Sequence, residues 1–204
     1  MANFRRIGIL GGSFNPIHLG HLVLAEQARE LLRLEKIIFV PAYLRPHKRA
    51  GRLALAQERH HMISRALKSN PSFAVSDIEL RRKGISYSID TLNQFKCIFP
   101  HTSLYFIVGS DFLKEFSIWK DLSSFSKICK FVVALRPGYP LAKLPPAQAR
   151  QGRGRLPGNM QTIEITSLDI SSTAIRERIR KGQSIRYLVL EEVRRYILKK
   201  GLYR

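Results

Sequence analysis

The sequence predicts an α/β protein with a doubly wound, mostly parallel sheet and a small helical portion at its C-terminal end. Short apolar runs alternate along the chain with longer segments whose apolar residues recur at helical spacing. Strands that alternate with helices in this way are typical of βαβ units. The runs IIFV at 37–40 and FVVAL at 131–135 are apolar throughout, as expected for strands that helices cover on both faces. Ligands of such a sheet bind at the carboxyl ends of its strands.

The elements follow in a regular order from the N-terminus. Six strands are expected, at residues 6–10, 36–40, 73–78, 104–108, 130–135 and 162–165. Helices are expected at 18–32, 57–67, 88–95, 172–181 and 190–199. With 204 residues and 45% hydrophobic content, the chain suits a single domain over 1–204. The segment 137–157 is rich in proline and arginine and is expected to form a flexible basic loop.

The charge balance restricts the kind of partner. The chain has 35 Lys and Arg against 15 Asp and Glu, a net charge of +20, and a pI near 10.6. Such a surface attracts polyanions, so nucleic acid, an anionic membrane and phosphorylated metabolites are all candidates; solubility alone is the simpler explanation. Cys97 and Cys129 lie too far apart in sequence to predict a disulfide framework or a zinc site. No signal peptide or membrane span is predicted, so a cytoplasmic location without membrane binding is expected.

The strongest motif is GGSFNPIHLGH at 11–21, which follows the first strand and opens the first helix. Glycines at a strand exit let the backbone approach a phosphate, and the start of a helix offers unpaired N–H groups to an anion. His18 and His21 lie three residues apart, on one face of the helix start. Imidazoles placed there can donate hydrogen bonds to phosphate oxygens. Capping or packing histidines are the alternative, and no carboxylate or cysteine nearby completes a metal site.

A second motif, ISSTAIR at 170–176, opens a helix near the end of the chain. Ser171 or Ser172 is expected to cap that helix. Arg176 stands just past its first turn, where a cation opposes the helix dipole unless an anion is bound. Arginine beside serine and threonine hydroxyls is well suited to hold a phosphate tail. A solvated arginine is the alternative.

Together these motifs resemble the nucleotidyltransferase family that carries the HxGH and ISSTxIR signatures. The string GISYSIDTL at 84–92 and the residues GSD at 109–111 extend the resemblance over nearly the whole chain. They make it most similar to the bacterial nicotinate mononucleotide adenylyltransferases. The resemblance implies a Rossmann-like nucleotidyltransferase fold, ATP and nicotinate mononucleotide as substrates, and Mg²⁺ as cofactor. Phe116-Ser117 stands where that family commonly has a Trp-Tyr pair.

The resemblance also implies a role for each matching residue. Catalytic contacts are expected from His18, His21, Lys48 and Arg176. Contacts with ATP and its phosphates are expected from Gly11, Gly12, Ser13, Phe14, Gly109, Asp111, Ser171, Ser172 and Thr173. The pyridine nucleotide is expected to contact Asn15, Ser88, Phe116 and Trp119; plain core packing is the alternative for the two aromatic residues.

The expected reaction transfers the adenylyl group of ATP to nicotinate mononucleotide and releases pyrophosphate. Mg²⁺ is expected to bind through the ATP phosphates, because no carboxylate cluster is visible in the sequence. Nicotinamide mononucleotide or phosphopantetheine are alternative acceptors, and the GISYSIDTL region and chain length argue against the second. A nucleic-acid-binding module on the same fold is the alternative from another class, although no basic motif interleaved with aromatic residues appears. The sequence does not indicate an oligomeric state.

Overall fold

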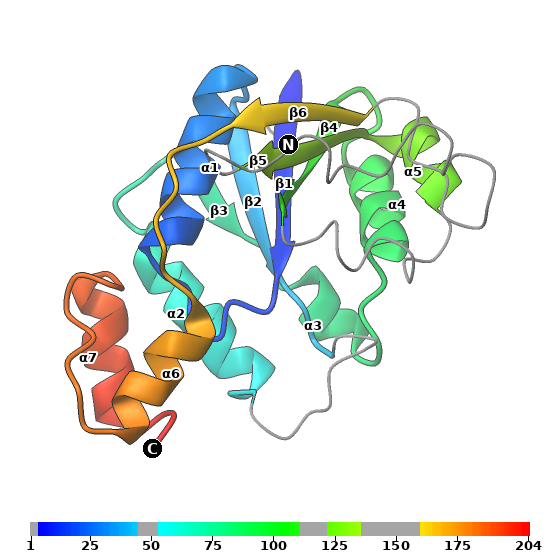
Figure 1. The fold of residues 1–204 in the computed structure, drawn as a ribbon. Coiled ribbons are helices and arrows are strands. Elements are labelled where there is room, and N and C mark those ends of the chain that lie inside the picture. Colours follow the sequence, from blue (N-terminus) through cyan, green and yellow to red (C-terminus); the bar gives the residue numbers. More distant parts are fainter. Residues whose placement is uncertain (1–3, 45–52, 111–121, 136–159) are drawn as a thin grey trace.

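The computed structural model describes residues 4–44, 53–110, 122–135 and 160–204. In these ranges six strands form one sheet in the order β3-β2-β1-β4-β5-β6, and every neighbouring pair is parallel (Figure 1). The strands are β1 (Arg6–Gly12), β2 (Lys36–Pro41), β3 (Phe73–Val75), β4 (Ser103–Gly109), β5 (Lys130–Leu135) and β6 (Met160–Glu164). This is the doubly wound order, in which the direction of winding reverses between β1 and β4. The expected fold class is confirmed.

The central strands are apolar because both of their faces are covered. In β1, Ile9 pairs with Ile38 of β2 on one side and with Phe106 of β4 on the other, and all three side chains are buried. The outer strand β6 differs, since Ile163 is its one buried residue. Continuous burial in the centre and partial burial at the edge agree with the apolar runs of the sequence.

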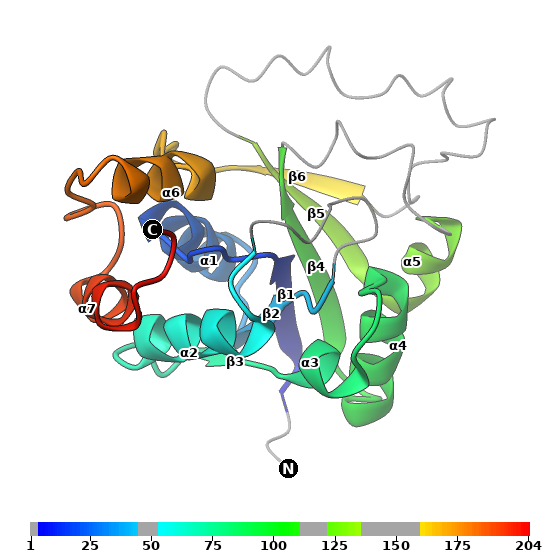
Figure 2. The ribbon, with the colours of Figure 1, turned by 90° about the horizontal axis from the view of Figure 1, so that it is seen from below.

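Helices form a layer on each face of the sheet (Figure 2). The helices are α1 (Leu19–Leu31), α2 (Ala56–Leu67), α3 (Ile78–Arg82), α4 (Ser88–Ile98), α5 (Leu122–Ile128), α6 (Ser172–Arg180) and α7 (Glu191–Lys200). Helices α1, α2, α6 and α7 cover one face, and α3, α4 and α5 cover the other. Two core clusters match these layers: Phe39 and Ile107 belong to the first, and their neighbours Ile38 and Phe106 belong to the second. Successive residues of a strand point to opposite faces, which divides the core in this way.

The C-terminal helices join the first layer. Ile175 of α6 and Val193 and Ile197 of α7 are buried in the same cluster as Ala25 of α1 and Met62 of α2. The first and the last helix therefore share one core, whereas a single domain over 1–204 stays a prediction. None of the helices in the described ranges combines the length and the apolar content that a membrane crossing requires.

Three details differ from the sequence prediction. The third strand ends at Val75 rather than at residue 78, because the Ser76 hydroxyl accepts a hydrogen bond from the Ile78 N–H (3.3 Å) and the chain turns into α3. Helix α3, of five residues, and α5, with four serines or lysines among its seven, are too short and too polar for periodicity to predict. The basic loop expected at 137–157 lies outside the described residues.

Candidate active site

The predicted phosphate motif lies where the winding of the sheet reverses. Strand β1 ends at Gly12, and its neighbour β4 ends at Gly109. Among the described residues, a Cβ added at Gly109 would meet only the tip of Leu24, at 4.0 Å. Gly11 is exposed at the same edge. The geometry agrees with ligand binding at this reversal point of a doubly wound sheet.

Phe14 shapes the loop that follows β1. Its backbone has a φ of 45°, an uncommon conformation for a residue with a side chain, and its ring is buried. The ring meets His21 edge-on, at 5.0 Å between centroids. A Cβ on Gly12 would lie 3.0 Å from the same ring, so the glycine makes room for it. Phe14 therefore supports His21 by packing; contact with ATP stays a prediction.

The two histidines of the motif form a stacked pair. Their ring centroids lie 3.7 Å apart, with 27° between the planes. The backbone N–H of His18 donates to Nδ1 of His21 (3.2 Å), which leaves the proton of a neutral His21 ring on Nε2. Burial, and secondly the neighbouring His18, hold the pKa of His21 well below its ordinary value. At neutral pH His21 is therefore an uncharged ring that can donate a hydrogen bond from Nε2.

Gly20 is required by the position of the His18 ring. A Cβ on Gly20 would lie 3.1 Å from Nδ1 and 3.2 Å from Cε1 of His18, closer than carbon atoms ordinarily pack. The glycine between the two histidines thus keeps space for the imidazole of His18, which is 7% exposed.

The ISSTAIR motif lies directly against this loop. The Ser172 hydroxyl donates to the carbonyl of Pro16 (2.8 Å), and Nη1 of Arg176 donates to the carbonyl of Asn15 (2.8 Å). Ser171, rather than Ser172, caps α6 by accepting from the Ala174 N–H (3.1 Å). The structure therefore joins two motifs that lie about 150 residues apart in the chain.

Thr173 and Asn15 complete this junction. Thr173 accepts a hydrogen bond from Nη2 of Arg176 (3.2 Å). Asn15 is 2% exposed, and its Oδ1 accepts from the Ala54 N–H (3.1 Å) and from the hydroxyl of Tyr203 (2.8 Å). Its amide oxygen thus ties the loop to the segment before α2 and to the C-terminal end of the chain. Contact between Asn15 and the pyridine nucleotide stays a prediction.

Ser13 has an orphaned hydroxyl. Its Oγ is buried and, within the described residues, makes no hydrogen bond. Buried polar atoms are nearly always paired, and an unpaired one calls for a partner such as a ligand or water. Donors from Ser13, His21 and Arg176 fit an anion.

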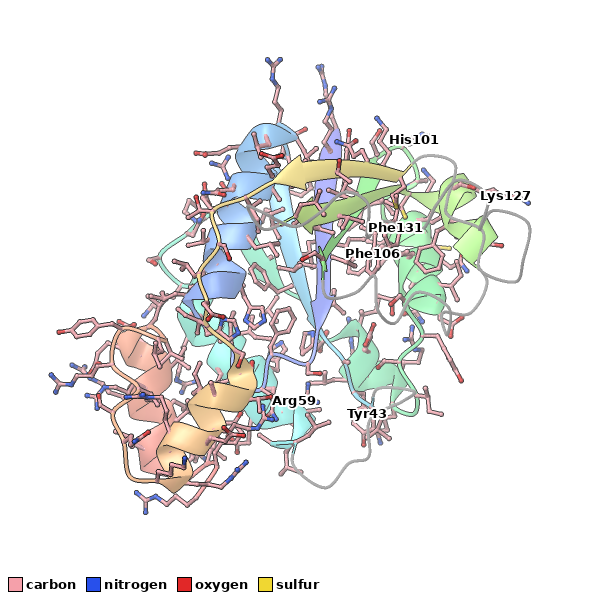
Figure 3. The ribbon with its side chains drawn as sticks, viewed as in Figure 1. Tyr43, Arg59, His101, Phe106, Lys127 and Phe131 are labelled. Carbon is pink, nitrogen blue, oxygen red and sulfur yellow. The ribbon has the colours of Figure 1, made fainter. Side chains whose placement is uncertain are left out.

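Arg59 was not predicted and is the largest fully buried side chain among the described residues. It is 1% exposed and donates from Nη1 to the carbonyl of Ser13 (2.8 Å), from Nη2 to Tyr43 (3.2 Å) and from Nε to Ala54 (3.0 Å). Figure 3 shows Arg59 and Tyr43 beyond the carboxyl ends of β1 and β2. Its burial could have been predicted from helical spacing, because residues 59, 62, 63 and 66 share the buried face of α2.

Glu79 is a second buried charged residue that was not predicted. It is 6% exposed and accepts a hydrogen bond from Thr91 (2.6 Å). Burial raises the pKa of this carboxyl group, whereas hydrogen bonds from Ser86 and Thr91 oppose that rise. Ser88, expected to contact the pyridine, is the first residue of α4, just beyond this cluster.

Four predicted site residues, Lys48, Asp111, Phe116 and Trp119, lie outside the described residues. In the described ranges, no group of three histidine, cysteine, aspartate or glutamate side chains is arranged to hold a metal ion.

Comparison with known proteins identifies the family of the chain. The family model described as cytidylyltransferase-like matches residues 9–178. A protein of Desulfitobacterium hafniense named "Probable nicotinate-nucleotide adenylyltransferase" is 44% identical over 98% of this chain and 96% of its own. A protein of the same name from Moorella thermoacetica is 43% identical over 98% and 92% of the two chains. The structure of Plasmodium falciparum nicotinic acid mononucleotide adenylyltransferase complexed with NaAD aligns with a TM-score of 0.75 at 21% identity, over 98% of this chain and 97% of that one; that likeness shows the fold.

A doubly wound sheet with paired histidines and a serine-arginine helix start at its reversal point defines a nucleotidyltransferase. The chain belongs to the cytidylyltransferase-like family, and within it to the nicotinate-nucleotide adenylyltransferases.

Proposed function

We propose that this enzyme transfers the adenylyl group of ATP to the phosphate of nicotinate mononucleotide, forming nicotinate adenine dinucleotide and pyrophosphate in NAD biosynthesis. The observation that carries the proposal is the junction of the two motifs. The Ser172 and Arg176 bonds to Pro16 and Asn15 hold the start of α6 against the loop that leads to His18 and His21. The junction therefore brings the start of α6 close to the loop that opens α1, and the N-termini of helices are suited to bind a polyphosphate.

The reaction needs no nucleophile from the protein. An oxygen of the acceptor phosphate, already ionised near neutral pH, bonds to the α-phosphorus of ATP, and the bond from that phosphorus to the pyrophosphate oxygen breaks. Negative charge grows on the departing pyrophosphate. Catalysis then rests on alignment of the two substrates and on donors that neutralise this charge.

The site residues divide this work between them. We assign the ATP phosphates to Ser13, His18, His21 and Lys48, and the departing pyrophosphate to Ser171, Ser172, Thr173 and Arg176. The neutral His21 suits this task, because a donor from Nε2 strengthens its bond as the phosphate gains charge. Gly109 and Asp111, at the end of β4, are assigned to the ribose.

Mg²⁺ fits the site as a companion of ATP rather than as a resident ion. The described donors around the loop are imidazole, hydroxyl and guanidinium groups, whereas Mg²⁺ prefers oxygen anions. The phosphates of ATP supply such oxygens. The ion would neutralise phosphate charge there, and the protein would hold the phosphates that carry it.

The acceptor is assigned to the segment before α4 and to Ser88. The Ser88 hydroxyl and the Ser88 N–H, at the start of α4, are donors, as a carboxylate requires, and the net charge of +20 favours the more anionic acceptor. A carboxamide placed against donors leaves its NH₂ unpaired, at a cost of about 1–3 kcal/mol per lost contact. We therefore expect nicotinate mononucleotide to exceed nicotinamide mononucleotide in kcat/KM by roughly tenfold or more.

The test is pyrophosphate release from Mg-ATP with a panel of acceptors at equal ionic strength. The panel contains both mononucleotides, phosphopantetheine and a no-acceptor control. Release that is fastest with nicotinate mononucleotide supports the proposal. A preference for the amide would overturn the acceptor assignment, and RNA binding that weakens steeply with salt, without turnover, would favour the nucleic-acid alternative.

A further inference from the structure

Two buried side chains of opposite charge lie on either side of one peptide segment. Arg59 lies in α2 and Glu79 in α3, and both are nearly inaccessible. Within the described residues, Arg59 and Glu79 do not form an ion pair with each other. The backbone of Tyr43, just after β2, connects them instead.

Hydrogen bonds connect Arg59 to Ser86 without a break. Nη2 of Arg59 donates to the Tyr43 carbonyl (3.2 Å), and the Tyr43 N–H donates to the Ser86 hydroxyl (2.9 Å). Ser86 also interacts with the Glu79 side chain, and this interaction opposes the rise that burial causes in the pKa of that carboxyl group. At the other end, Nη1 of Arg59 donates to the carbonyl of Ser13 (2.8 Å). The path thus runs from the phosphate loop to the segment that precedes α4.

Further bonds stabilise the far end of the path. Thr91 donates to Glu79 (2.6 Å) and accepts from Nη2 of Arg82 (3.0 Å). The Ser86 N–H donates to the carbonyl of Leu44 (2.8 Å), next to Tyr43. Ser86 is therefore bound to the segment after β2 by both its backbone and its side chain.

The chemistry of the two ends gives the path a single polarity. A guanidinium group only donates hydrogen bonds, and an ionised carboxylate only accepts them. Arg59 therefore requires the carbonyl of Tyr43, the Tyr43 N–H finds its acceptor in the Ser86 hydroxyl, and Glu79 accepts from the Thr91 hydroxyl of α4. A reversed or shifted segment would leave buried polar groups unpaired, which is costly.

This path lies between the two parts of the site whose substrates must be aligned for the reaction. Ser13 belongs to the loop assigned to ATP, and residues 86–88 belong to the segment assigned to the acceptor. We propose that Arg59 and Glu79 are positioning residues that, through Tyr43 and Ser86, hold the ATP loop and the acceptor segment in reactive register. The inference rests on the proposed function, because a reaction without a protein nucleophile depends on how its two substrates are aligned, and a misplacement of about 1 Å can cost about a hundredfold in rate.

The experiment compares small changes along the path. Ser86→Ala and Glu79→Gln are expected to lower kcat tenfold to a hundredfold. The dissociation constants of ATP and of nicotinate mononucleotide, each measured alone by calorimetry, are expected to change less than threefold. Ser86→Thr, which keeps a hydroxyl, should restore most of kcat. Arg59→Lys combined with Ser86→Ala should lower kcat by less than the product of the two single effects, because both act through Tyr43.

Thr102→Val is the matched control. Thr102 is buried, and its hydroxyl, like that of Ser86, binds the backbone of a distant segment: it donates to the carbonyl of Phe4 (2.7 Å), at the amino ends of β1 and β4. This variant should lose thermal stability comparable to that of Ser86→Ala, without loss of kcat. Near-normal kcat in folded Ser86→Ala and Glu79→Gln, or multiplicative effects in the double variant, would overturn the proposal. The wild-type acceptor panel tests the function separately, and the kcat comparison uses whichever acceptor that panel identifies.

Discussion

The phosphate side and the acceptor side of the site are built in different ways. On the phosphate side, two contiguous motifs at 11–21 and 170–176 supply the donors, and direct hydrogen bonds join them. On the acceptor side, the network uses single residues from separate elements: Arg59, Tyr43, Glu79 and Ser86. Where donors lie within one helix start, spacing along the chain positions them. Where two substrates must be aligned across the edge of a sheet, buried charged residues from separate elements position them, and such residues form no contiguous motif in the sequence.

The largest effect that tests this difference is expected at His21. His21→Ala removes a transition-state donor from a side built of local contacts, so kcat should fall about a hundredfold with little change in the KM of ATP. Steady-state kinetics with the preferred acceptor measures this.

His101→Ala is the control for that variant. His101 is exposed and lies beyond the opposite end of the sheet (Figure 3), so its replacement should leave kcat unchanged. A folded His21→Ala enzyme with near-normal kcat would remove His21 from the mechanism.

A smaller effect is expected at Arg176, and it concerns binding. Charge-assisted hydrogen bonds contribute about 1.5–3 kcal/mol, so Arg176→Ala should weaken ATP binding about tenfold or more in calorimetry. The bond from Arg176 to Asn15 also stabilises the free protein, so a modest loss of thermal stability is expected as well. The sequence predicted no such loss, because it showed only an arginine that opposes the dipole of its helix.

Arg180→Ala provides the comparison on the same helix. Arg180 is exposed in the last turn of α6, where its charge favours the helix dipole. Its removal should leave ATP affinity unchanged. Equal ATP affinity in Arg176→Ala and in the wild type would identify Arg176 as a structural residue.

The sequence was sufficient for the sheet and for the two motifs that meet in the structure. Continuous apolar runs predicted the buried strands, and the strings GGSFNPIHLGH and ISSTAIR carried their own geometry. It was insufficient for Arg59 and Glu79, because helical periodicity identifies a buried face but does not say which charge on that face finds a partner. Their contacts join α2 to residue 13 and α3 to residue 91, and only the folded chain brings these together. The tautomer of His21 could not be predicted from the sequence either, because the hydrogen bond from the His18 backbone N–H determines it.

The smallest expected effect contrasts the acid sensitivity of the two sides. The pKa of His21 is lowered by burial and by His18, so the unfolded chain binds a proton there more readily than the folded protein. The stability linked to a neutral His21 is therefore complete above about pH 6.5 and is lost as the pH falls toward the lower folded pKa.

The pKa of Glu79 is raised, chiefly by burial, against hydrogen bonds from Ser86 and Thr91 and the charges of Arg82 and Arg59. Its linkage has the opposite sign: the stability it contributes is complete below the unfolded glutamate pKa of about 4.3 and is lost as the pH rises through the folded value.

Acidification from pH 7 to pH 5 should therefore separate the two sides. His21→Ala should lose less stability than the wild type over this range, since it lacks the group that resists protonation in the folded state. Glu79→Gln should lose more, because the wild-type carboxyl takes up a proton in the folded state and partly offsets the loss. The measurement is the free energy of unfolding by denaturant at half-unit pH steps, with each variant compared by its slope against pH, so that groups titrating equally in all forms cancel. Slopes that shift in the same direction for both variants would contradict the assignment of opposite linkages. Unchanged slopes for both variants would contradict both linkages.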